Sequence, residues 1–480
     1  MPNYTQIAIP DQLLEPEITT SPFGLNPGEI KMATGLSGFV QISDMYTHYQ
    51  EHNKNMVNQE APQQVQYIFP VKAVEEQDTH LFCPKCSTYL KRNGTRHVKI
   101  KHLTYGNIPM VFDVEKQQFV CINPDCGHTE AQEISFKDPS HRITHTCRTF
   151  VEDLLKMGLT LKEVSRVSNV DKNIVKEIDK TRLLEKYTVD GAGKKMKPPE
   201  EYSPHLGIDE FLLHKGHQYA TIIIDLDTGH VLYIAKSKKK QVVYDFMKWV
   251  GDDWMKHVEA IACDMNADFE EAFRDKYPDI KVVFDYFHLV KNFNDKVVTE
   301  VRKDEFKRLK SEGRDEEAAR LKGARFILTS RRETLAKHDL DIGKIINPGS
   351  ELFNIPVKVR ELKLEERYDE LIRENKLFFT IDLIKEALHE AYRTTDVDVM
   401  KKNIGRIIGI CYATENKHFK WFGNLLKNHL HGILTHAGLQ LSSGKVEGTN
   451  RMIKTIRWQA YGFGDDEYFF LKIMDASRAA

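Results

Sequence analysis

The sequence has no long apolar run and almost no net charge. No stretch of its 480 residues approaches the roughly 18 uninterrupted apolar residues of a membrane-spanning helix. Its first residues, MPNYTQIAIPDQLLEPEITT, lack the basic start and apolar run of a secretory signal. We therefore expect a cytoplasmic protein without a membrane partner. With 69 Lys and Arg against 70 Asp and Glu, net charge neither favours nor excludes a nucleic-acid partner.

Length and composition indicate a globular protein of several domains. At about 100–200 residues per domain, a chain of this length is expected to hold three or so. Hydrophobic residues make up 41% of the chain and charged residues 29%, which is ordinary for a globular protein and excludes a disordered chain or a fibre.

Cysteine is scarce, and four of the seven cysteines stand in two close pairs. Paired cysteines in a cytoplasmic chain are metal ligands more often than disulfides. Four thiolates fill the tetrahedral sphere of Zn²⁺ and leave no open position, so the zinc should be structural. The short β-like runs between the pairs predict a basic zinc ribbon over residues 76–140, in which His128 could replace one ligand. The pairs are Cys83-x2-Cys86 and Cys121-x4-Cys126.

Residues 141–187 have the apolar period of helices. Leu161, Val164 and Val167 define a second helix, and a third begins after Asp171, which can cap it. Two short helices around a tight turn have helix-turn-helix spacing, so we expect a DNA-binding domain; an ordinary scaffold bundle is the alternative. Five polar side chains of the third helix would face DNA: Lys172, Asn173, Lys176, Lys180 and Arg182.

The rest of the chain divides by texture. Residues 1–75 carry no strong pattern, and we interpret them as an irregular or partly helical segment of unclear role; residues 188–204 form a linker. Residues 205–291 predict three strands in a meander, then helix, strand, helix and strand, which is an α/β layout with a mixed sheet. Residues 292–436 are long charged helices without a strand, and 437–480 return to a compact amphipathic helix.

Three carboxylates stand in apolar or glycine-flanked surroundings. Asp209 lies in the first strand of the meander, Asp264 follows the apolar run AIAC, and Glu447 opens the last helix. The two aspartates can point from one end of a sheet. Such a triad can hold two Mg²⁺ ions roughly 3.5–4 Å apart for phosphoryl transfer. Asp225 and Asp227 are competitors that we interpret as turn residues.

Polar and basic residues surround Glu447 in sequence. On a helix, Glu447, Asn450 (or Arg451) and Lys454 share a face. Positive and amide groups beside a metal site suit a polyanionic substrate, and a solvated helix face is the alternative. The candidates for phosphate contacts are Lys445, Asn450, Arg451, Lys454 and Arg457.

The order of these motifs resembles the DDE transposases of the ISL-three insertion-sequence family. The matching blocks are GIDEF…ATIIIDLDTGHVL, then CDMN…FDYFHLVKN, then SSGKVEGTNRMIKTIRWQAYGF. The resemblance runs from about Leu81 to Met474, and the N-terminal segment does not match. It implies an RNase-H-like catalytic core with an all-α insertion, preceded by the zinc ribbon and the helix-turn-helix, and with Asp209, Asp264 and Glu447 as metal ligands.

The resemblance also implies an activity and a further residue. In related enzymes a D/C-x-x-H signature lies near the active site; here it is Asp285-Tyr-Phe-His288. His288 could contact phosphate or transfer a proton, or simply cap the following helix. The implied function is DNA cleavage and strand transfer at terminal inverted repeats. It would use two Mg²⁺ (or Mn²⁺) ions and would be carried out by a homodimer on transposon ends and target DNA in a bacterial cell. A non-catalytic DNA-binding regulator and an RNase-H-like nuclease without strand transfer are the alternatives.

Overall fold

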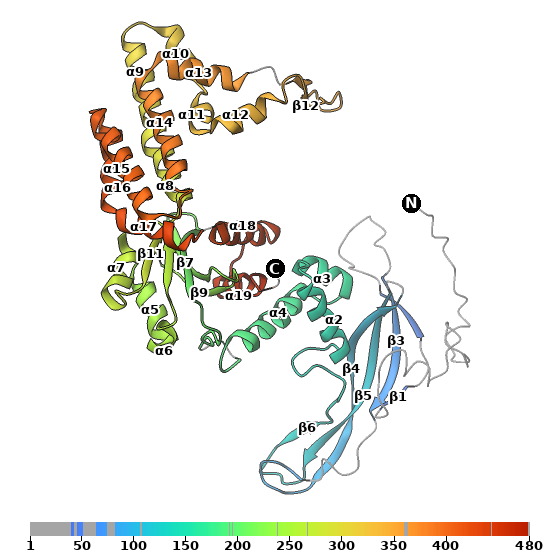
Figure 1. The fold of residues 1–480 in the computed structure, drawn as a ribbon. Helices are drawn as coiled ribbons and strands as arrows, with labels where there is room; N and C mark the ends of the chain where they lie inside the picture. The colour runs from blue at the N-terminus through green and yellow to red at the C-terminus, as the bar shows by residue number, and fades with distance from the viewer. Residues whose placement is uncertain are drawn as a thin grey trace. The chain divides into compact units, whose positions relative to one another are not determined.

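The computed structural model describes residues 40–42, 46–50, 64–73, 82–105, 108–191, 193, 195–237, 239–265, 267–359, 363–442 and 444–478. The chain divides into two compact units, Met1–Met196 with Gln459–Gly462 and Lys197–Trp458 with Phe463–Ala480 (Figure 1). None of the helices within the described ranges is long and apolar enough to cross a membrane.

A six-stranded sheet forms most of the first unit. Its centre is the long antiparallel hairpin of β4 and β5, and β3 runs parallel to β5 on the other side. Ile100, Phe112 and Val114 are fully buried in it. The strands are β1 (Val40–Ile42), β2 (Tyr46–Gln50), β3 (Gln64–Ala73), β4 (Leu90–Tyr105), β5 (Ile108–Cys121) and β6 (Thr129–Ala131).

The first three strands correct the interpretation of residues 1–75 as irregular or partly helical. Where the structure describes this segment, it is strand. The signal was weak because β3 is held by a non-local parallel partner, with Tyr67 opposite Met110, and such pairing leaves no mark on the local sequence. The sheet of the ribbon therefore begins before residue 76.

Three helices follow the sheet, as the sequence predicted: α2 (His145–Lys156), α3 (Leu161–Ser168) and α4 (Lys172–Tyr187). Each begins at a side-chain cap, from Thr144, Thr160 and Asp171. Asn169 turns the chain between α3 and α4 in the left-handed conformation, with φ 55°. The shared core includes Cys147, Val151, Leu155, Val164, Val170, Val175 and Ile178. Val167, expected in the apolar stripe, is exposed.

The second unit is built on a five-stranded mixed sheet in the order β11-β10-β7-β8-β9. The first three strands form the predicted antiparallel meander, and β10 and β11 run parallel to β7. The strands are β7 (His205–His214), β8 (Gln218–Asp225), β9 (Val231–Ala235), β10 (Ala260–Cys263) and β11 (Lys281–Phe284).

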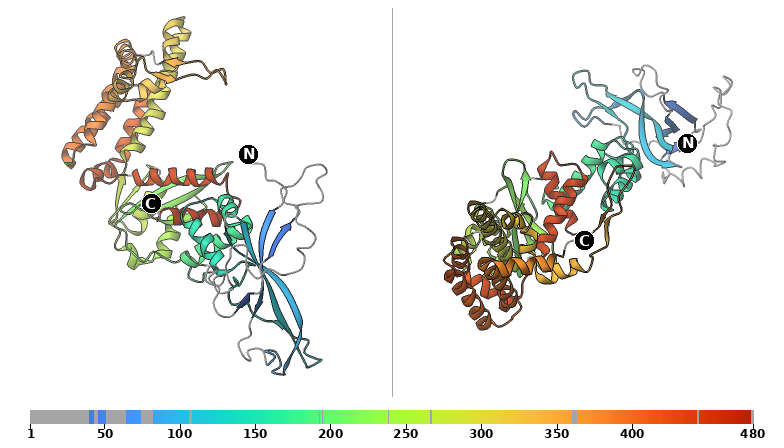
Figure 2. Two further views of the ribbon diagram at one scale, coloured as in Figure 1. Left: turned by 90° about the vertical axis from the view of Figure 1, so that its right-hand side faces the viewer. Right: turned by 90° about the horizontal axis from the view of Figure 1, so that it is seen from above.

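Helices cover both faces of this sheet (Figures 1 and 2). One face packs on α5 (Gln241–Val250), α6 (Asp252–Met255) and α7 (Ala267–Lys276), where Leu206 and Ile208 share a buried cluster with Phe246 and Phe273. Gly251, with φ 86°, splits the single helix expected there into α5 and α6. The other face carries α18 (Gly444–Gln459) and α19 (Asp466–Ala476), where the Phe211 ring meets Phe469 edge-on.

The helical insertion leaves the sheet through one long helical segment. It consists of α8 (Tyr286–Phe293), the π-helix η2 (Asn294–Val298) and α9 (Thr299–Ser311). The other helices are α10 (Asp315–Leu321), α11 (Arg325–Thr329), α12 (Arg332–Asp339), α13 (Leu364–Glu374), α14 (Lys376–Ala391), α15 (Val397–Ala413), α16 (Lys417–Asn428) and α17 (Leu430–Leu439).

The expectation of an all-helical insertion is wrong in one place. Strands β12 (Ile345–Asn347) and β13 (Lys358–Val359) form a small antiparallel hairpin between α12 and α13. The stretch contains two prolines and two glycines among β-branched residues, and this punctuation was the available signal.

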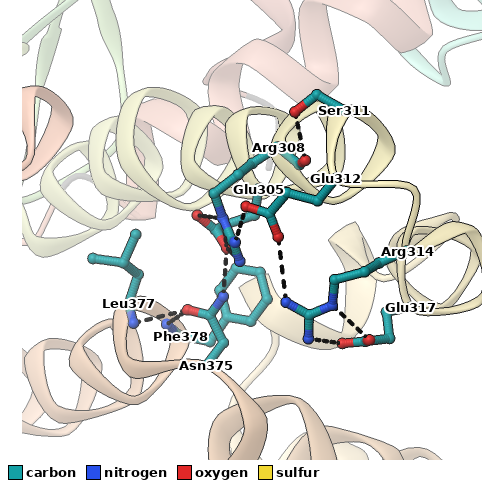
Figure 3. A network of polar contacts seen from close by, with 9 residues as sticks. All are labelled: Glu305, Arg308, Ser311, Glu312, Arg314, Glu317, Asn375, Leu377 and Phe378. Atoms are coloured by element: carbon teal, nitrogen blue, oxygen red, sulfur yellow. Dashed lines mark hydrogen bonds and ion pairs between the residues drawn. The ribbon is translucent and has the colours of Figure 1, made fainter.

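Polar contacts join the helices of the insertion (Figure 3). Asn375, the N-cap of α14, accepts hydrogen bonds from the amides of Leu377 and Phe378 and donates to Glu305 of α9 at 2.7 Å. Arg308 completes the cluster by bridging Glu305 and Glu312 along α9. The carboxylate of Glu305, which is also paired with Arg308, therefore links α9 to α14.

Candidate functional site

Three aspartates belong to adjacent parallel strands: Asp209 lies within β7, and Asp264 and Asp285 directly follow β10 and β11. Ala262 of β10 is opposite Gly207 of β7, and Cys263 is opposite Phe284 of β11. Asp264 and Asp285 are each the next residue after these paired positions, and Asp209 is two residues after Gly207. Asp209 is in the middle of the longer strand β7 and Asp264 directly follows the shorter β10, and the two are close enough for the charge of Asp264 to act on Asp209.

Asp209 is partly buried and interacts with several neighbours. Burial, the largest effect, raises the pKa of its carboxyl above the ordinary 3.8, and the charge of Asp264 adds to this. The Glu210 amide, which donates at 2.8 Å, the charge of His288 and the Asn450 side chain act in the opposite direction. A carboxylate that is costly to ionise and has a second carboxylate nearby is a natural cation site.

Helix α18 is seated directly on β7. A Cβ on Gly207 would lie 2.6 Å from Val446 Cγ2 and 2.8 Å from Leu226 Cδ2, so only glycine allows this approach. One turn further, Asn450 Nδ2 donates to Asp209 Oδ2 at 2.5 Å. The helix that carries Glu447 is therefore docked on the strand that carries Asp209.

Glu447 does not complete a compact ligand cluster in this structure. Its Oε1 accepts a hydrogen bond from Arg451 Nη2 at 2.6 Å, one turn along α18. Among the described residues, the four cysteines form the group of His, Cys, Asp and Glu side chains close enough to hold one ion; the three carboxylates do not. Carboxylate oxygens are the ligands that Mg²⁺ prefers, so the donor chemistry of the three side chains suits this ion, although their spacing in this structure does not form a site.

His288 lies at the same edge of the sheet. The cap of α8 is Asp285, whose Oδ2 accepts from the Phe287 amide at 3.1 Å, so His288 does not serve as the cap. Its Nδ1 is buried and has no hydrogen-bond partner in the described part of the chain, and the same holds for Asn450 Oδ1. Two unmatched polar atoms beside Asp209 are what a site built for a further ligand would show.

The candidate DNA contacts differ in how exposed their side chains are. Lys172 and Asn173 are exposed on α4, and Arg451 and Lys454 on α18; Lys176 and Lys180 are half-buried. Lys445 is exposed but donates to the Asp227 carbonyl.

Two arginines are used within the fold. Arg182, predicted to point outward, has a side chain only 12% exposed and binds the buried Asp179 at 2.8 Å. Arg457 donates to the Leu212 carbonyl at 2.6 Å and lies over the Phe469 ring. An acid at i−3 was the sequence signal for Arg182.

Of the two competing carboxylates, Asp227 lies in the turn, as expected, whereas Asp225 is the last residue of β8 and closes that turn with its side chain. Asp225 Oδ1 accepts from the Asp227 amide at 2.7 Å, and its Oδ2 accepts from the Thr228 hydroxyl at 2.8 Å. This Asx turn shapes the connection from β8 to β9.

The four paired cysteines form one cluster in the first unit. Their sulfur atoms all lie within 4.8 Å of one another, with Cys83–Cys126 at 3.7 Å and Cys86–Cys121 at 3.5 Å. A tetrahedron with Zn–S bonds of about 2.3 Å has edges of about 3.8 Å, so the spacing fits Zn²⁺. His128 is not in the cluster, and its Nε2 contacts Glu130 at 3.1 Å.

Two similar turns present these thiols. Each ends in a left-handed residue directly after its second cysteine, Ser87 with φ 57° and Gly127 with φ 61°. Hydrogen bonding to Thr88 lowers the pKa of Cys86 to about 6, whereas burial raises that of Cys121 to about 12. Zinc ligands are thiolates, and the hydrogen bonds from Thr88 favour this form at Cys86.

Comparison with known proteins places this geometry in a family. Residues 206–473, more than half of the 480, match the family of ISL3-type DDE transposases, described as "Transposase". The match spans the mixed sheet, the insertion and α18. The chain belongs to this family, which confirms the resemblance seen in the sequence, and a transposase acts on DNA.

One relative aligns over most of the chain. It is the "Transposase for insertion sequence element IS1001" of Bordetella parapertussis, 25% identical over 398 residues. The alignment covers 82% of this chain and 88% of the relative, so the similarity reaches beyond the family match into the first unit.

Proposed function

We propose that this chain binds the terminal inverted repeats of an insertion sequence and catalyses Mg²⁺-dependent DNA cleavage and strand transfer. Asp209, Asp264 and Glu447 would be the metal ligands of an RNase-H-like core over 205–291 and 437–480. The observation that carries the proposal is that Asp264, directly after β10, lies close enough to act on Asp209 of the neighbouring strand β7, with α18 held against Asp209 by Asn450. An antiparallel meander followed by two parallel strands is the sheet expected for such a core.

The reaction would proceed in two phosphoryl transfers. Water attacks the phosphodiester at the element's end and releases a 3′-hydroxyl, which then attacks target DNA and displaces a 3′-oxygen there. When bound, Mg²⁺ (or Mn²⁺) would activate the nucleophile and stabilise the leaving oxygen.

The chain's own groups have separate tasks. Asn450 orients Asp209, and the exposed Arg451 and Lys454 offer cations to the DNA backbone. His288, with its unmatched Nδ1 beside Asp209, is suited to hold a phosphate oxygen or move a proton.

Three isosteric variants test this assignment: Asp209→Asn, Asp264→Asn and Glu447→Gln. Each should abolish cleavage and joining of element-end DNA in Mg²⁺ while leaving end binding intact, because the metal is lost and not a DNA contact. Asp279→Asn, in an exposed turn before β11, is the matched control. Joining by Glu447→Gln at the wild-type rate would refute the triad. Wild-type protein that only cuts would indicate a nuclease, and one that only binds would indicate a regulator.

We further propose that the ribbon (76–140) and the helix-turn-helix (141–187) recognise the DNA ends. One observation favours the ribbon in particular. Arg96 of β4 lies directly opposite Lys116 of β5, although like charges in this position destabilise a sheet. Burial, Arg96 and Lys137 together lower the pKa of Lys116. A phosphate placed here would relieve the repulsion.

The salt dependence of binding tests this row of cations. Removing one phosphate contact should reduce the slope of log K against log salt by about 0.9. Lys116→Gln should show this reduction with full-length protein and element-end DNA. Lys99→Gln is the control, because Lys99 lies opposite an acid, Asp113. Equal slopes for Lys116→Gln and wild type would contradict the assignment.

A further inference from the structure

The hairpin segment 340–359 of the insertion exposes an unusual number of large apolar side chains. Leu352 is 84% exposed, Leu340 80% and Phe353 72%. Six more lie within the same twenty residues and are exposed by more than a third: Ile342, Ile345, Ile346, Ile355, Val357 and Val359. We call these nine side chains the apolar hairpin surface.

Specific backbone contacts shape this segment. Ile345 pairs with Val359, and Ser350 and Ile355 exchange two backbone hydrogen bonds of 2.9 Å. Gly349, with φ 74°, allows this closure, because a Cβ there would lie 2.9 Å from the Ile355 carbonyl oxygen. The segment extends from the helices of the insertion near β12 (Figure 1). An ordered hairpin that exposes apolar side chains to water is a candidate contact surface for a partner.

The area of the surface is that of a protein interface. Nine such side chains leave on the order of 1,000 Å² open, against roughly 300–600 Å² for the largest apolar patch of a typical monomer. A standard interface takes about 800 Å² from each partner. Consecutive residues such as Ile345 and Ile346 of β12 point to opposite faces of the hairpin, so a partner that packs on both faces would meet the share that a stable dimer needs from one subunit.

Charge favours a copy of the same chain over DNA. The segment holds two acids, Asp341 and Glu351, and two bases, Lys344 and Lys358, so it carries no net charge. Lys344 is paired with Asp341 at 2.6 Å. A polyanion gains little here, whereas two copies related by a two-fold axis meet without net repulsion.

The strands also offer open edges. In the described part of the chain, β12 and β13 pair with each other and with no further strand. An unpaired edge beside apolar side chains is a template for pairing with another chain.

We propose that the apolar hairpin surface is the dimer interface of this protein, formed by the same segment of two copies. The inference deepens the proposed function, because joining two element ends in one event requires two active sites. The inference can be tested separately from cleavage, because dimerisation is measured by the mass of the particle.

The test compares full-length Leu352→Lys/Phe353→Lys with wild type by light scattering during size exclusion over a range of concentrations, with and without element-end DNA. Wild type should show twice the mass of the 55.6 kDa chain. The double variant should weaken dimerisation at least about 100-fold, as expected for two apolar residues at the centre of an interface. Phe379→Lys, at a half-exposed phenylalanine on α14, is the control and should remain dimeric.

Several outcomes would overturn the proposal. They are a wild type that stays monomeric in every condition, a double variant that dimerises as well as wild type, and a control that dissociates equally. A double variant that loses DNA binding at unchanged mass would show that the surface contacts DNA instead. Because both lysines replace exposed side chains, equal melting temperatures for the two variants serve as the check on folding. A dimer that does not cut DNA would support this inference and refute the proposed function.

Discussion

The cysteine centre and the carboxylate site differ in how complete they are without metal. The four sulfur atoms are already spaced for Zn²⁺, whereas Glu447 is turned to Arg451 and stays out of reach of a shared ion. The cysteines come from two tight turns joined by the β4–β5 hairpin. The carboxylates come from two strands and a distant helix, and their charges repel until a cation joins them. A structural metal site can close early, while a catalytic one stays open to its substrate.

The largest expected effect comes from removing one ligand of the cysteine centre. Cys83→Ser should lose zinc and unfold the ribbon, because a structural zinc contributes roughly 10 kcal/mol or more to folding. Binding of element-end DNA should disappear while the second unit still unfolds cooperatively. Metal analysis and thermal unfolding of the full chain measure both effects. His128→Ala is the control and should keep its zinc; zinc loss there would mean that His128 is a ligand.

The carboxylate site depends on the docking of α18 against β7. Adding a single methyl group at Gly207 should disturb this docking. Gly207→Ala places a Cβ 2.6 Å from Val446 Cγ2, and overpacking of this kind costs about 1–3 kcal/mol. We expect a lower free energy of unfolding and a large loss of DNA cleavage, because Glu447 moves with the helix.

A second substitution sharpens this result. Val446→Ala removes the methyl groups nearest the new Cβ, so Gly207→Ala/Val446→Ala should recover part of the stability lost by Gly207→Ala. Leu226 Cδ2, 2.8 Å away, limits the recovery. Strictly additive free energies in this double-mutant cycle would show that α18 does not rest on β7 at this point.

The sequence predicted local elements well and long-range contacts poorly. The meander from β7 to β9, the caps at Thr160 and Asp171, and the cysteine pairs all follow from patterns within a few residues. The bond between Asn450 and Asp209 joins positions 241 apart, and nothing local announces it. Asn450 was expected to contact phosphate, because its helical face was visible but not the strand beneath it. The β12–β13 hairpin is a different case. Its prolines and glycines indicated turns, but the helical pattern of the flanking sequence led to the prediction of helix throughout.

The smallest expected effect is on the difference in stability between wild type and Asp209→Asn at the carboxylate site. The sign of this difference should depend on whether Mg²⁺ is present. Burial raises the pKa of Asp209 above 3.8, so the folded protein holds this proton more tightly than the unfolded chain. The stability that Asp209 contributes is present in full below the unfolded pKa and is lost as pH rises through the folded pKa. In Mg²⁺-free buffer without chelator, which leaves zinc bound, Asp209→Asn should therefore melt above wild type at neutral pH. The gap should close on acidification.

Adding Mg²⁺ should reverse this order, because the ion stabilises only a protein that binds it. Wild type should gain melting temperature with rising Mg²⁺ concentration, and Asp209→Asn should not. Asp279→Asn, the exposed control, should follow wild type in both series. If wild type and Asp209→Asn melted together at every pH and every Mg²⁺ concentration, Asp209 would be neither strained by burial nor a metal ligand. The cysteine centre is not expected to show such a reversal, because its four sulfur atoms already lie within 4.8 Å of one another.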